Sequence, residues 1–401
     1  MAKNSMKPRI RFKGFTDAWE QRKLGTLGET YAGLSGKSKE DFGHGKAEFV
    51  PYMNVFMNPI ADVAMTEAIE IDDRQAKVKN GDIFFTTSSE TPEEVGMSSV
   101  WLKNGSNIYL NSFCFGFRPS ESINSYYLAY MLRSSGVRQK IVFLAQGISR
   151  YNISKKKMME IEVPMPICAE QRQLGGIFKQ LDNLITLHQR KYDKIVNIKK
   201  ALLEKMFPAE GEEVPKIRFK GFTEAWEQRE FNSIAKRITE MTDTEDLPRV
   251  EYEDIVSGQG TLNKDINKKK SCKTGILFDN GDVLFGKLRP YLKNWLFATF
   301  MGIAVGDFWV LRANNADGLY IYTLLQIDAF QDIANQSTGT KMPRADWSLV
   351  SKQRFLTPTV VPEQRKIGEF FKQLDNLITL HQRQLEKLKN IKSVLLEKMF
   401  V

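Results

Sequence analysis

Two polar loops carry the residue types that contact nucleic acids. The first, AQGISRYNISKKK, occupies residues 145–157, and the second, NQSTGTKMPRADW, occupies residues 335–347. Arginine and lysine reach phosphates and guanine acceptors, asparagine and glutamine suit adenine, and backbone amides beside glycine and serine suit phosphates. The candidates for DNA contact in these loops are Arg150, Tyr151, Asn152, Lys155, Lys341 and Arg344.

A second basic and aromatic group lies in GDVLFGKLRPYLKNWLF, residues 281–297. Its candidates for DNA contact are Lys287, Arg289, Tyr291 and Lys293. Any single one of these side chains is equally consistent with a solvated surface charge, so the prediction concerns each group and not each residue. The run of three lysines at 268–270 is more typical of an exposed turn.

Motifs for catalysis, nucleotide binding and metal binding are missing. GLSGKS at 33–38 resembles a phosphate-binding loop, but Tyr31 stands where the first glycine of that motif belongs. No G-x-G-x-x-G, H-E-x-x-H or N-P-P-Tyr motif occurs, and three histidines supply a histidine-based triad poorly. Acidic nuclease clusters are not excluded by spacing alone. We expect a binding protein with no catalytic residue, metal or cofactor of its own.

The elements that must position these loops belong to an internal duplication, in which two sequence blocks of the first half recur in the second half. Residues 10–22, IRFKGFTDAWEQR, return at 217–229 with Asp17 replaced by Glu224. Residues 170–207 return at 363–400 with 27 of 38 positions identical. The segments between these blocks, 23–169 and 230–362, share little sequence. A constant frame with divergent inserts predicts two recognition modules on one scaffold with internal pseudo-two-fold symmetry.

The longer repeated block has the heptad pattern of a coiled-coil helix. Apolar residues and one histidine recur every seven positions without an internal proline. About 38 residues at 1.5 Å each give a helix of about 57 Å. A helix buried in the core of one domain is the alternative. The predicted seam between the two helices consists of Leu174, Leu181, His188, Ile195 and Leu202 with Ile367, Leu374, His381, Leu388 and Leu395.

The two helices most simply pair with each other, and a two-fold relation makes the pair antiparallel. His188 and His381 lie at the helix midpoints, so we predict that their rings approach each other. A packed or hydrogen-bonded pair is favoured over a metal or pH role. The second seam position of the pattern is occupied by Ile177, Leu184, Ile198, Phe370, Leu377 and Ile391.

The divergent segments have the composition of mixed α and β structure. Short apolar runs at 81–89, 100–102 and 107–119 predict strands, and 125–144 has helical spacing. The second segment repeats this order, with strands at 281–297 and 302–313 and a helix at 319–335. The fold class is therefore α+β.

Composition limits the remaining possibilities. The 401 residues carry a formal net charge of +10, which favours a polyanionic partner such as nucleic acid. No apolar run reaches the 18 to 20 residues that a membrane helix needs, and the first residues lack a secretory signal. Cys114, Cys168 and Cys272 fit neither a disulfide framework nor a zinc site, so we expect a cytoplasmic protein.

This arrangement resembles the specificity subunit of type I restriction-modification enzymes over essentially the whole chain. The residues that carry the resemblance are AEQRQLGGIFKQLD at 169–182, PEQRKIGEFFKQLD at 362–375, GDVLFGKLRPYL at 281–292 and the FKGFT-x-AWEQR blocks at 13–22 and 220–229. One departure is that residues 81–89 read GDIFFTTSS, so the roles of Lys287 and Arg289 cannot be copied to the first half.

The resemblance implies an architecture. Two globular target-recognition domains, residues 1–168 and 209–361, are separated by two long antiparallel coiled-coil helices, residues 169–208 and 362–401. Each domain reads one half of a bipartite double-stranded DNA target, and the conserved helices set the gap between the halves.

The resemblance also implies partners. Two modification subunits carry S-adenosylmethionine and the adenine methyltransferase site, and restriction subunits, when present, add ATP-driven cleavage. A stand-alone DNA-binding repressor or architectural protein is the alternative, and an endonuclease or methyltransferase in its own right is a further one. A specificity subunit captures a methyltransferase subunit, whereas a stand-alone protein does not. An endonuclease or methyltransferase in its own right reacts when the purified chain is mixed with DNA, Mg²⁺ and S-adenosylmethionine.

Overall fold

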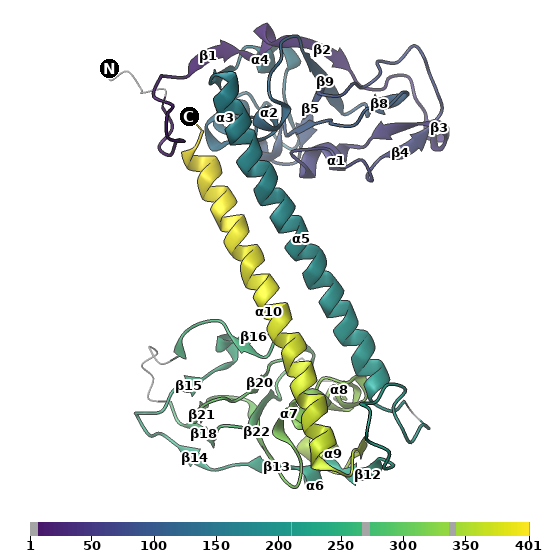
Figure 1. The fold of residues 1–401 in the computed structure, drawn as a ribbon, viewed down its shortest axis with the longest axis vertical. Helices are drawn as coiled ribbons and strands as arrows, with labels where there is room; N and C mark the ends of the chain where they lie inside the picture. The colour runs from purple at the N-terminus through teal and green to yellow at the C-terminus, as the bar shows by residue number, and fades with distance from the viewer. Residues whose placement is uncertain (1–6, 210, 267–272, 337–341, 401) are drawn as a thin grey trace. The chain divides into compact units, whose positions relative to one another are not determined.

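The chain forms two compact units that exchange parts of their sequence. The computed structural model describes residues 7–209, 211–266, 273–336 and 342–400 (Figure 1). Unit 1 consists of Met1–Leu187 with Leu385–Val401, and unit 2 consists of His188–Gln384. Each unit contains one α+β domain and one half of each long helix. The sequence-based division has four parts and treats each long helix as a separate part. In the structure each long helix is shared between the two units.

Unit 1 is built around a four-stranded antiparallel sheet in the order β2-β9-β5-β7. A smaller sheet has the order β4-β3-β8, and two strand pairs, β1-β11 and β10-β6, complete the unit. The strands are β1 (Glu20–Lys23), β2 (Gly28–Ala32), β3 (Phe42–Val50), β4 (Glu67–Ile69), β5 (Ile83–Thr86), β6 (Ser88–Ser89), β7 (Ser98–Val100), β8 (Ile108–Leu110), β9 (Cys114–Pro119), β10 (Tyr151–Asn152) and β11 (Glu162–Met165).

Short helices cover the sheets of unit 1. They are α1 (Tyr52–Met57), α2 (Ser125–Met131), α3 (Ser135–Phe143) and α4 (Lys155–Met159). The single helix predicted over 125–144 is wrong, because the chain turns between α2 and α3. There the Ser134 hydroxyl donates to the Met131 carbonyl at 2.7 Å and ends the first helix. The predicted helix over 319–335 of unit 2 is divided in the same way.

Unit 2 repeats the same order of elements. Its main sheet has the order β13-β22-β19-β20, and a second sheet has the order β14-β18-β21-β15. The strands are β12 (Glu227–Glu230), β13 (Ala235–Ile238), β14 (Met241–Thr242), β15 (Arg249–Val250), β16 (Ile255–Val256), β17 (Thr261–Leu262), β18 (Gly275–Phe278), β19 (Val283–Gly286), β20 (Trp295–Phe297), β21 (Gly302–Ala304), β22 (Phe308–Ala313) and β23 (Arg354–Thr357). The short helices are α6 (Phe231–Ile234), α7 (Gly318–Leu324), α8 (Asp328–Ala334) and α9 (Trp347–Val350).

Two long helices, α5 (Cys168–Met206) and α10 (Val361–Lys398), confirm the heptad prediction. The duplicated IRFKGFT-x-AWEQR block braces the start of each one. In unit 1 the buried carboxylate of Glu170 accepts hydrogen bonds from Arg11, at 2.7 and 2.8 Å, and from Trp19 at 3.0 Å. In unit 2, Glu363 accepts from Arg218 and Trp226 in the same way. This shared ion pair gives a structural reason for the duplication of the block.

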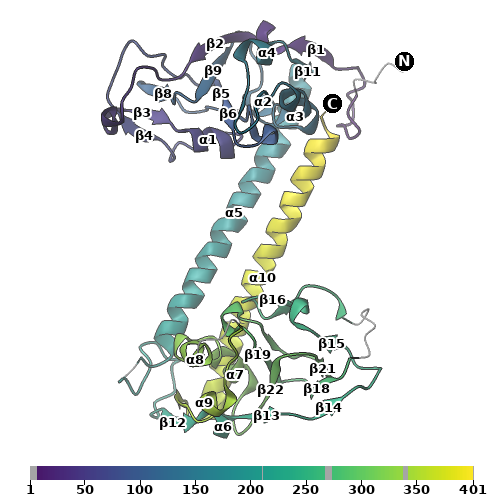
Figure 2. The same cartoon turned by 180° about the vertical axis from the view of Figure 1, so that it is seen from behind.

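Each unit also receives the far end of the helix that begins in the other unit. Phe400, after α10, packs against Trp19 of unit 1 with ring centroids 6.5 Å apart. Phe207, after α5, packs against Trp226 of unit 2 at 6.0 Å. Within each unit the two helix halves therefore lie side by side and antiparallel (Figure 1). In unit 2, α7 lies beside the first half of α10 (Figure 2), where Gly368 faces Leu319.

Two equivalent ion pairs join the helix halves. In unit 1, Lys392 of α10 donates to Asp182 of α5 at 2.5 Å. In unit 2, Lys199 of α5 donates to Asp375 of α10. A tyrosine hydroxyl from the domain reaches each carboxylate, since Tyr130 donates to Asp182 at 2.8 Å and Tyr322 to Asp375 at 3.3 Å. The same ion pair therefore occurs in both units. In unit 1 the first copy of the helix repeat supplies the aspartate and the second the lysine, and in unit 2 the copies are reversed.

The predicted seam is confirmed in part. None of its ten residues is exposed: Leu174, Leu181 and Ile367 are buried, and the other seven are half-buried. The Nδ1 atoms of His188 and His381 lie 3.0 Å apart in unit 2, so the predicted approach of the rings is confirmed. At the second seam position Ile177 and Phe370 are half-buried, as predicted. The other four residues are exposed, because a two-helix contact covers a narrow stripe. These residues are Leu184, Ile198, Leu377 and Ile391.

The remaining predictions from composition concern the cysteines, the lysine run and membrane helices. Cys114 is buried and Cys168 exposed, and both are free thiols, while Cys272 and the three lysines at 268–270 lie outside the described residues. In the part of the chain that the structure describes, no helix combines the length and apolar character needed to cross a membrane.

Candidate nucleic-acid interface

The first candidate loop pairs with a second loop of unit 1. Strand β10 within residues 145–157 is antiparallel to β6, with Tyr151 opposite Ser89 and Asn152 opposite Ser88. The Ile153 amide also donates to the Thr87 carbonyl at 3.0 Å. We call residues 86–91 and 146–152 loop pair 1. It joins the predicted loop to TTSS, the sequence that replaces GKLRP in the first half.

The tip of loop pair 1 is a short hairpin. Gln146 and Asn152 exchange two backbone hydrogen bonds, of 2.9 and 2.8 Å. Gly147 has φ +147°, and a Cβ atom there would lie 2.0 Å from the Arg150 carbonyl oxygen, so the hairpin requires glycine at this position. Arg150 and Asn152 are exposed and Tyr151 is half-buried. Lys155 is exposed at the start of α4, directly after the hairpin.

The two candidate groups of unit 2 come together in an equivalent way. Leu288 and Arg344 form an antiparallel bridge. The Arg289 amide donates to the Pro343 carbonyl at 2.7 Å, and the Ala345 amide donates to the Lys287 carbonyl at 2.8 Å. We call residues 286–294 and 342–346 loop pair 2. Sequence reasoning named both stretches but could not show that they pair.

One carboxylate, missed by sequence reasoning, organises the charges of loop pair 2. Asp307 lies 3.5 Å from the Lys287 ammonium and 3.1 Å from the Arg344 guanidinium. All three side chains are partly open to solvent, so the ion pairs hold the cations in place without removing them from the surface. An incoming phosphate could exchange for Asp307 as their partner.

The remaining candidates of loop pair 2 have different environments. Tyr291 and Lys293 are exposed. Arg289 is half-buried with φ 49°, and its Nε is buried without a hydrogen-bond partner among the residues that the structure describes. Lys341 lies outside the described residues. The structure thus brings Lys287, Arg289 and Arg344 together and leaves Lys341 unplaced.

A tyrosine hydroxyl supports each loop pair from the domain side. In unit 1, Tyr52 donates to the Ser88 carbonyl at 2.7 Å. In unit 2, Tyr252 donates to the Asp307 carbonyl at 2.8 Å and accepts from the Leu288 amide at 2.9 Å. Burial raises the pKa of both tyrosines, so both hydroxyls stay protonated at neutral pH. A tyrosine two residues after Val50 and Val250 is the only sequence signal for this role.

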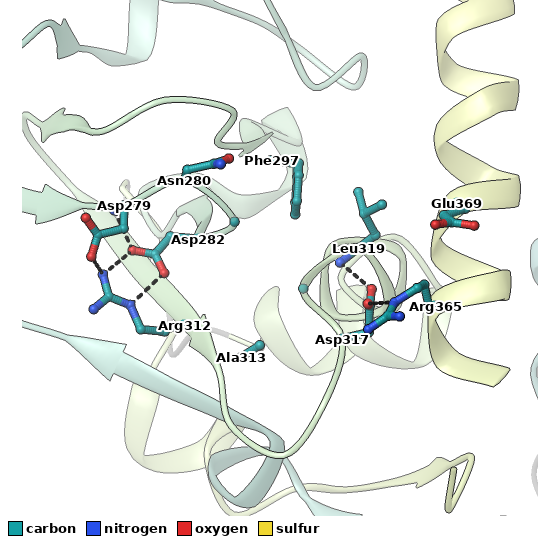
Figure 3. Close-up of a pocket in the computed structure, with 12 residues that line it drawn as sticks. Asp279, Asn280, Asp282, Phe297, Arg312, Ala313, Asp317, Leu319, Arg365 and Glu369 are labelled. Carbon is teal, nitrogen blue, oxygen red and sulfur yellow. Dashed lines mark hydrogen bonds and ion pairs between the residues drawn. The ribbon is translucent and has the colours of Figure 1, made fainter. Parts of the chain in front are cut away.

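A pocket of about 600 Å³ in unit 2 offers no comparable site (Figure 3). Its Arg312 guanidinium is held by Asp282 at 2.7 Å and Asp279 at 2.5 Å. Its Arg365 is 3.4 Å from Asp317. Arg118 and Asp82 make the equivalent ion pair in unit 1 at 2.7 Å. The recurrence indicates a brace within each domain and not a ligand site.

The side chains of the loop pairs are of the types that bind nucleic acids. Their side chains offer cations for phosphates and amides and hydroxyls for base edges. Among the described residues, no group of three or more histidine, cysteine, aspartate or glutamate side chains is arranged to hold a metal ion. These loops can therefore grip a nucleic-acid backbone and contact its bases.

Comparison with known families decides the classification. The family model named type I restriction modification DNA specificity domain matches residues 16–197 and again residues 223–390. The chain belongs to this specificity family. The two matches correspond to the two halves of the sequence repeat, so each half is one specificity domain.

Individual members of the specificity family are distant relatives. The chain is 24% identical over 283 residues to a specificity subunit ascribed to the type I restriction enzyme MjaX of Methanocaldococcus jannaschii, and the match covers 68% of this chain and 61% of that protein. It is 20% identical over 373 residues to the MjaVIII specificity subunit of the same organism, covering 86% and 83%.

One solved structure of a family member shares the fold. The S subunit of a type I restriction-modification system from M. genitalium matches with a TM-score of 0.61 and 16% identity, and the match covers 99% of both chains. The resemblance derived from the duplicated blocks is therefore confirmed.

Proposed function

We propose that this chain is the DNA-recognition subunit of a type I restriction-modification complex. Each unit reads one half of a bipartite target in double-stranded DNA through its loop pair. One observation carries the proposal: the two loop pairs occupy the same place in two equivalent domains but present different side chains. Loop pair 1 presents Ser149, Arg150 and Asn152, whereas loop pair 2 presents Lys287, Arg289 and Arg344. Two equivalent domains that present different side chains are suited to reading two different half-sites.

The long helices support a role in assembly with other subunits. Two leucines at equivalent positions of each helix repeat are exposed, Leu184 and Leu187 on α5 and Leu377 and Leu380 on α10. Exposed apolar pairs of this kind mark protein-protein contacts. Because the pair occurs twice, we propose that two copies of one modification subunit dock there, and that restriction subunits join that assembly.

The chemistry belongs to these partners in this proposal. S-adenosylmethionine is bound by the modification subunits and ATP by the restriction subunits, in the cytoplasm, while this chain chooses the DNA sequence. A stand-alone repressor or architectural protein is less consistent with a chain that matches the specificity family in both halves. The specificity role requires stable capture of a methyltransferase subunit, and the stand-alone role does not.

Methylation mapping tests the proposal directly. The chain is co-expressed with the methyltransferase subunit of its own restriction-modification system, and methylated adenines are mapped across the genome. We expect a two-part motif that disappears without the chain. Substituting Arg150 and Asn152 by alanine should relax one half of the motif, and substituting Lys287 and Arg344 should relax the other. The unaffected half is the internal control, and changes spread over both halves would contradict the assignment.

Subunit capture tests the docking role. The double variant L184Q/L187Q should reduce the amount of modification subunit that co-purifies, and L377Q/L380Q should do the same. L181Q is unsuitable because Leu181 is buried in the core of unit 1. Unchanged capture by all four substitutions together would place the modification subunits elsewhere.

A further inference from the structure

The tip of loop pair 1 carries an apolar side chain with no role in folding. Ile148 is 95% exposed, which is the highest value among the exposed large apolar side chains of the described residues. Between residues 144 and 166, all of which the structure describes, it is the one large apolar side chain that is exposed. Full exposure of an isoleucine gains nothing for stability.

The position of Ile148 is set by a firm frame. Its hairpin is closed by the two hydrogen bonds between Gln146 and Asn152 and held to β6. Directly after the hairpin, the Ile153 side chain is 7% exposed and belongs to the core of unit 1. The hairpin therefore presents Ile148 from an anchored base.

The surroundings of Ile148 are polar and basic. Ser149, Arg150 and Asn152 are exposed on the same hairpin, and Lys155, Lys156 and Lys157 are exposed just after it. A protein partner would require a cluster of apolar side chains at the centre of the contact. A single aliphatic side chain among cations and amides matches the groups that contact DNA bases.

We infer that Ile148 is a specificity-determining residue that packs against the C5 methyl group of a thymine in the major groove. This inference rests on the proposed DNA-recognition function and adds a residue and a base to it. The major groove is wide enough to admit an α-helix or a two-stranded β-ribbon. The tip that carries Ile148 is a short loop closed by one antiparallel bridge between Gln146 and Asn152. Thymine carries a methyl group on the floor of that groove, and apolar side chains distinguish thymine by contacting it. Lys155, Lys156 and Lys157 hold the neighbouring phosphates.

A substitution that removes only this methyl group tests the inference. Once the half-site of unit 1 is mapped, the assembled complex is bound to duplexes in which each of its thymines in turn is replaced by deoxyuridine. At one position we expect the affinity of the unaltered protein to fall about fourfold, since one buried methyl group is lost. I148A should bind both duplexes equally, and I148V should retain part of the discrimination.

A matched control separates this effect from general loss of apolar surface. Phe143 of α3 is 88% exposed in the same unit but lies outside loop pair 1. F143A should therefore keep the full discrimination between thymine and deoxyuridine. Loss of that discrimination in F143A as well would overturn the assignment to Ile148.

The outcomes separate this inference from the proposed function. If the complex shows no sequence-specific binding, the proposed function fails. If binding is specific but no thymine is sensitive to loss of its methyl group, or I148A still discriminates, the inference fails alone. The inference also fails alone if the mapped half-site of unit 1 contains no thymine on either strand. An I148A variant that weakens binding to both duplexes equally, with discrimination intact, would indicate a wedge between base pairs and overturn the methyl contact.

Discussion

At the scale of single residues, each loop pair is supported by the hydroxyl of a half-buried tyrosine of its domain. Polar loops rich in arginine and asparagine were recognisable from residue types alone. Tyr52 and Tyr252 were not, because their role comes from contacts with Ser88 and Leu288, which are 36 residues away along the chain. Asp307 was missed for the same reason, since an acidic residue in a predicted DNA interface has no distinctive sequence pattern.

Removing one hydroxyl tests the support of loop pair 2. Tyr252 joins the Leu288 amide to the Asp307 carbonyl, so Y252F leaves a buried amide without its acceptor at a cost of about 1–3 kcal/mol. We expect weaker recognition of the unit 2 half-site and normal recognition of the other half. Methylation mapping gives the readout, and Y192F, at a half-buried tyrosine of α5 outside both loop pairs, is the control. Relaxed recognition of both halves would indicate general unfolding instead.

The duplicated ion pairs permit a comparison inside one chain. The side chains of Asp375 and Lys199 are 5% and 11% exposed, whereas those of Asp182 and Lys392 are 29% and 21% exposed. Breaking a buried pair leaves a charge without its partner and costs about 3 kcal/mol, and breaking a more exposed pair costs about 1 kcal/mol. D375N should therefore destabilise unit 2 more than D182N destabilises unit 1.

Hydrogen exchange measured on peptides of α7 and of α2 follows the two units separately in these variants. Faster exchange in α7 of D375N than in α2 of D182N is the expected result. Equal effects in the two variants would show that burial does not govern the energies of these pairs.

At the scale of elements, the heptad pattern identified both long helices and the approach of the two histidines. The pattern could not show which flanking positions are covered, because burial depends on what lies beside the helix pair. Leu174 is buried while Leu184 is exposed, although both are leucines of one apolar stripe. The breaks between α2 and α3 and between α7 and α8 were also missed, because apolar spacing continues across them.

Two adjacent glycines of α5 should respond in opposite directions to alanine. A Cβ atom at Gly175 would lie 2.6 Å from the Asn124 Oδ1 atom that caps α2 and 2.8 Å from the Tyr127 amide. G175A should therefore lower the free energy of unfolding by about 1–3 kcal/mol. At Gly176 nothing lies within 4 Å, so G176A should raise it by up to about 1 kcal/mol through helix propensity.

Thermal unfolding measures both variants, and G176A is the matched control for G175A. The repeat provides a second test, because a Cβ atom at Gly368 would lie 2.6 Å from the Leu319 carbonyl carbon in unit 2. If G175A and G368A were as stable as the unaltered protein, the close approach of α2 and α7 to the long helices would be wrong.

The histidine pair should make the helix contact in unit 2 sensitive to acid. Burial, His188 and Lys191 lower the pKa of His381 from its ordinary value of 6.5. A lowered pKa means that the folded state disfavours the proton, so the stabilisation is complete above pH 6.5 and is lost as the pH falls through the folded-state value. The thermal midpoint should fall between pH 7.5 and 5, and H381Q should fall less. An equal decline in both proteins would assign the acid sensitivity to other groups.

At the scale of the whole molecule, the duplication was predictable, and so was the presence of two equivalent α+β domains. The exchange of helix ends between units was not. The sequence repeat shows that Phe207 and Phe400 are equivalent, but it does not show that each of them packs on the tryptophan of a particular domain. The target bases could not be predicted either. The two loop pairs differ in sequence where they would contact DNA, so the contacts of one cannot be inferred from the other.

Shortening both long helices tests their proposed role as a spacer. Deleting one heptad from each, residues 191–197 and 384–390, keeps the phase of the seam, leaves the proposed docking leucines in place and removes about 10 Å of helix. We expect the unspecified gap of the target to shorten by about three base pairs, with both half-sites unchanged. Methylation mapping reads out gap and half-sites together. Altered bases in either half-site would contradict the spacer role.

The exchange of helix ends also sets an order for folding during translation. The core of unit 1 contains Met399 and Phe400, so the domain that leaves the ribosome first cannot be completed until these two residues have been synthesised. The core of unit 2 draws on Met206 and Phe207, which are already available when its own strands emerge. The second domain can therefore close before the first. A nascent chain that still lacks α10 exposes apolar surface of unit 1, which favours aggregation and proteolysis until α10 has been synthesised.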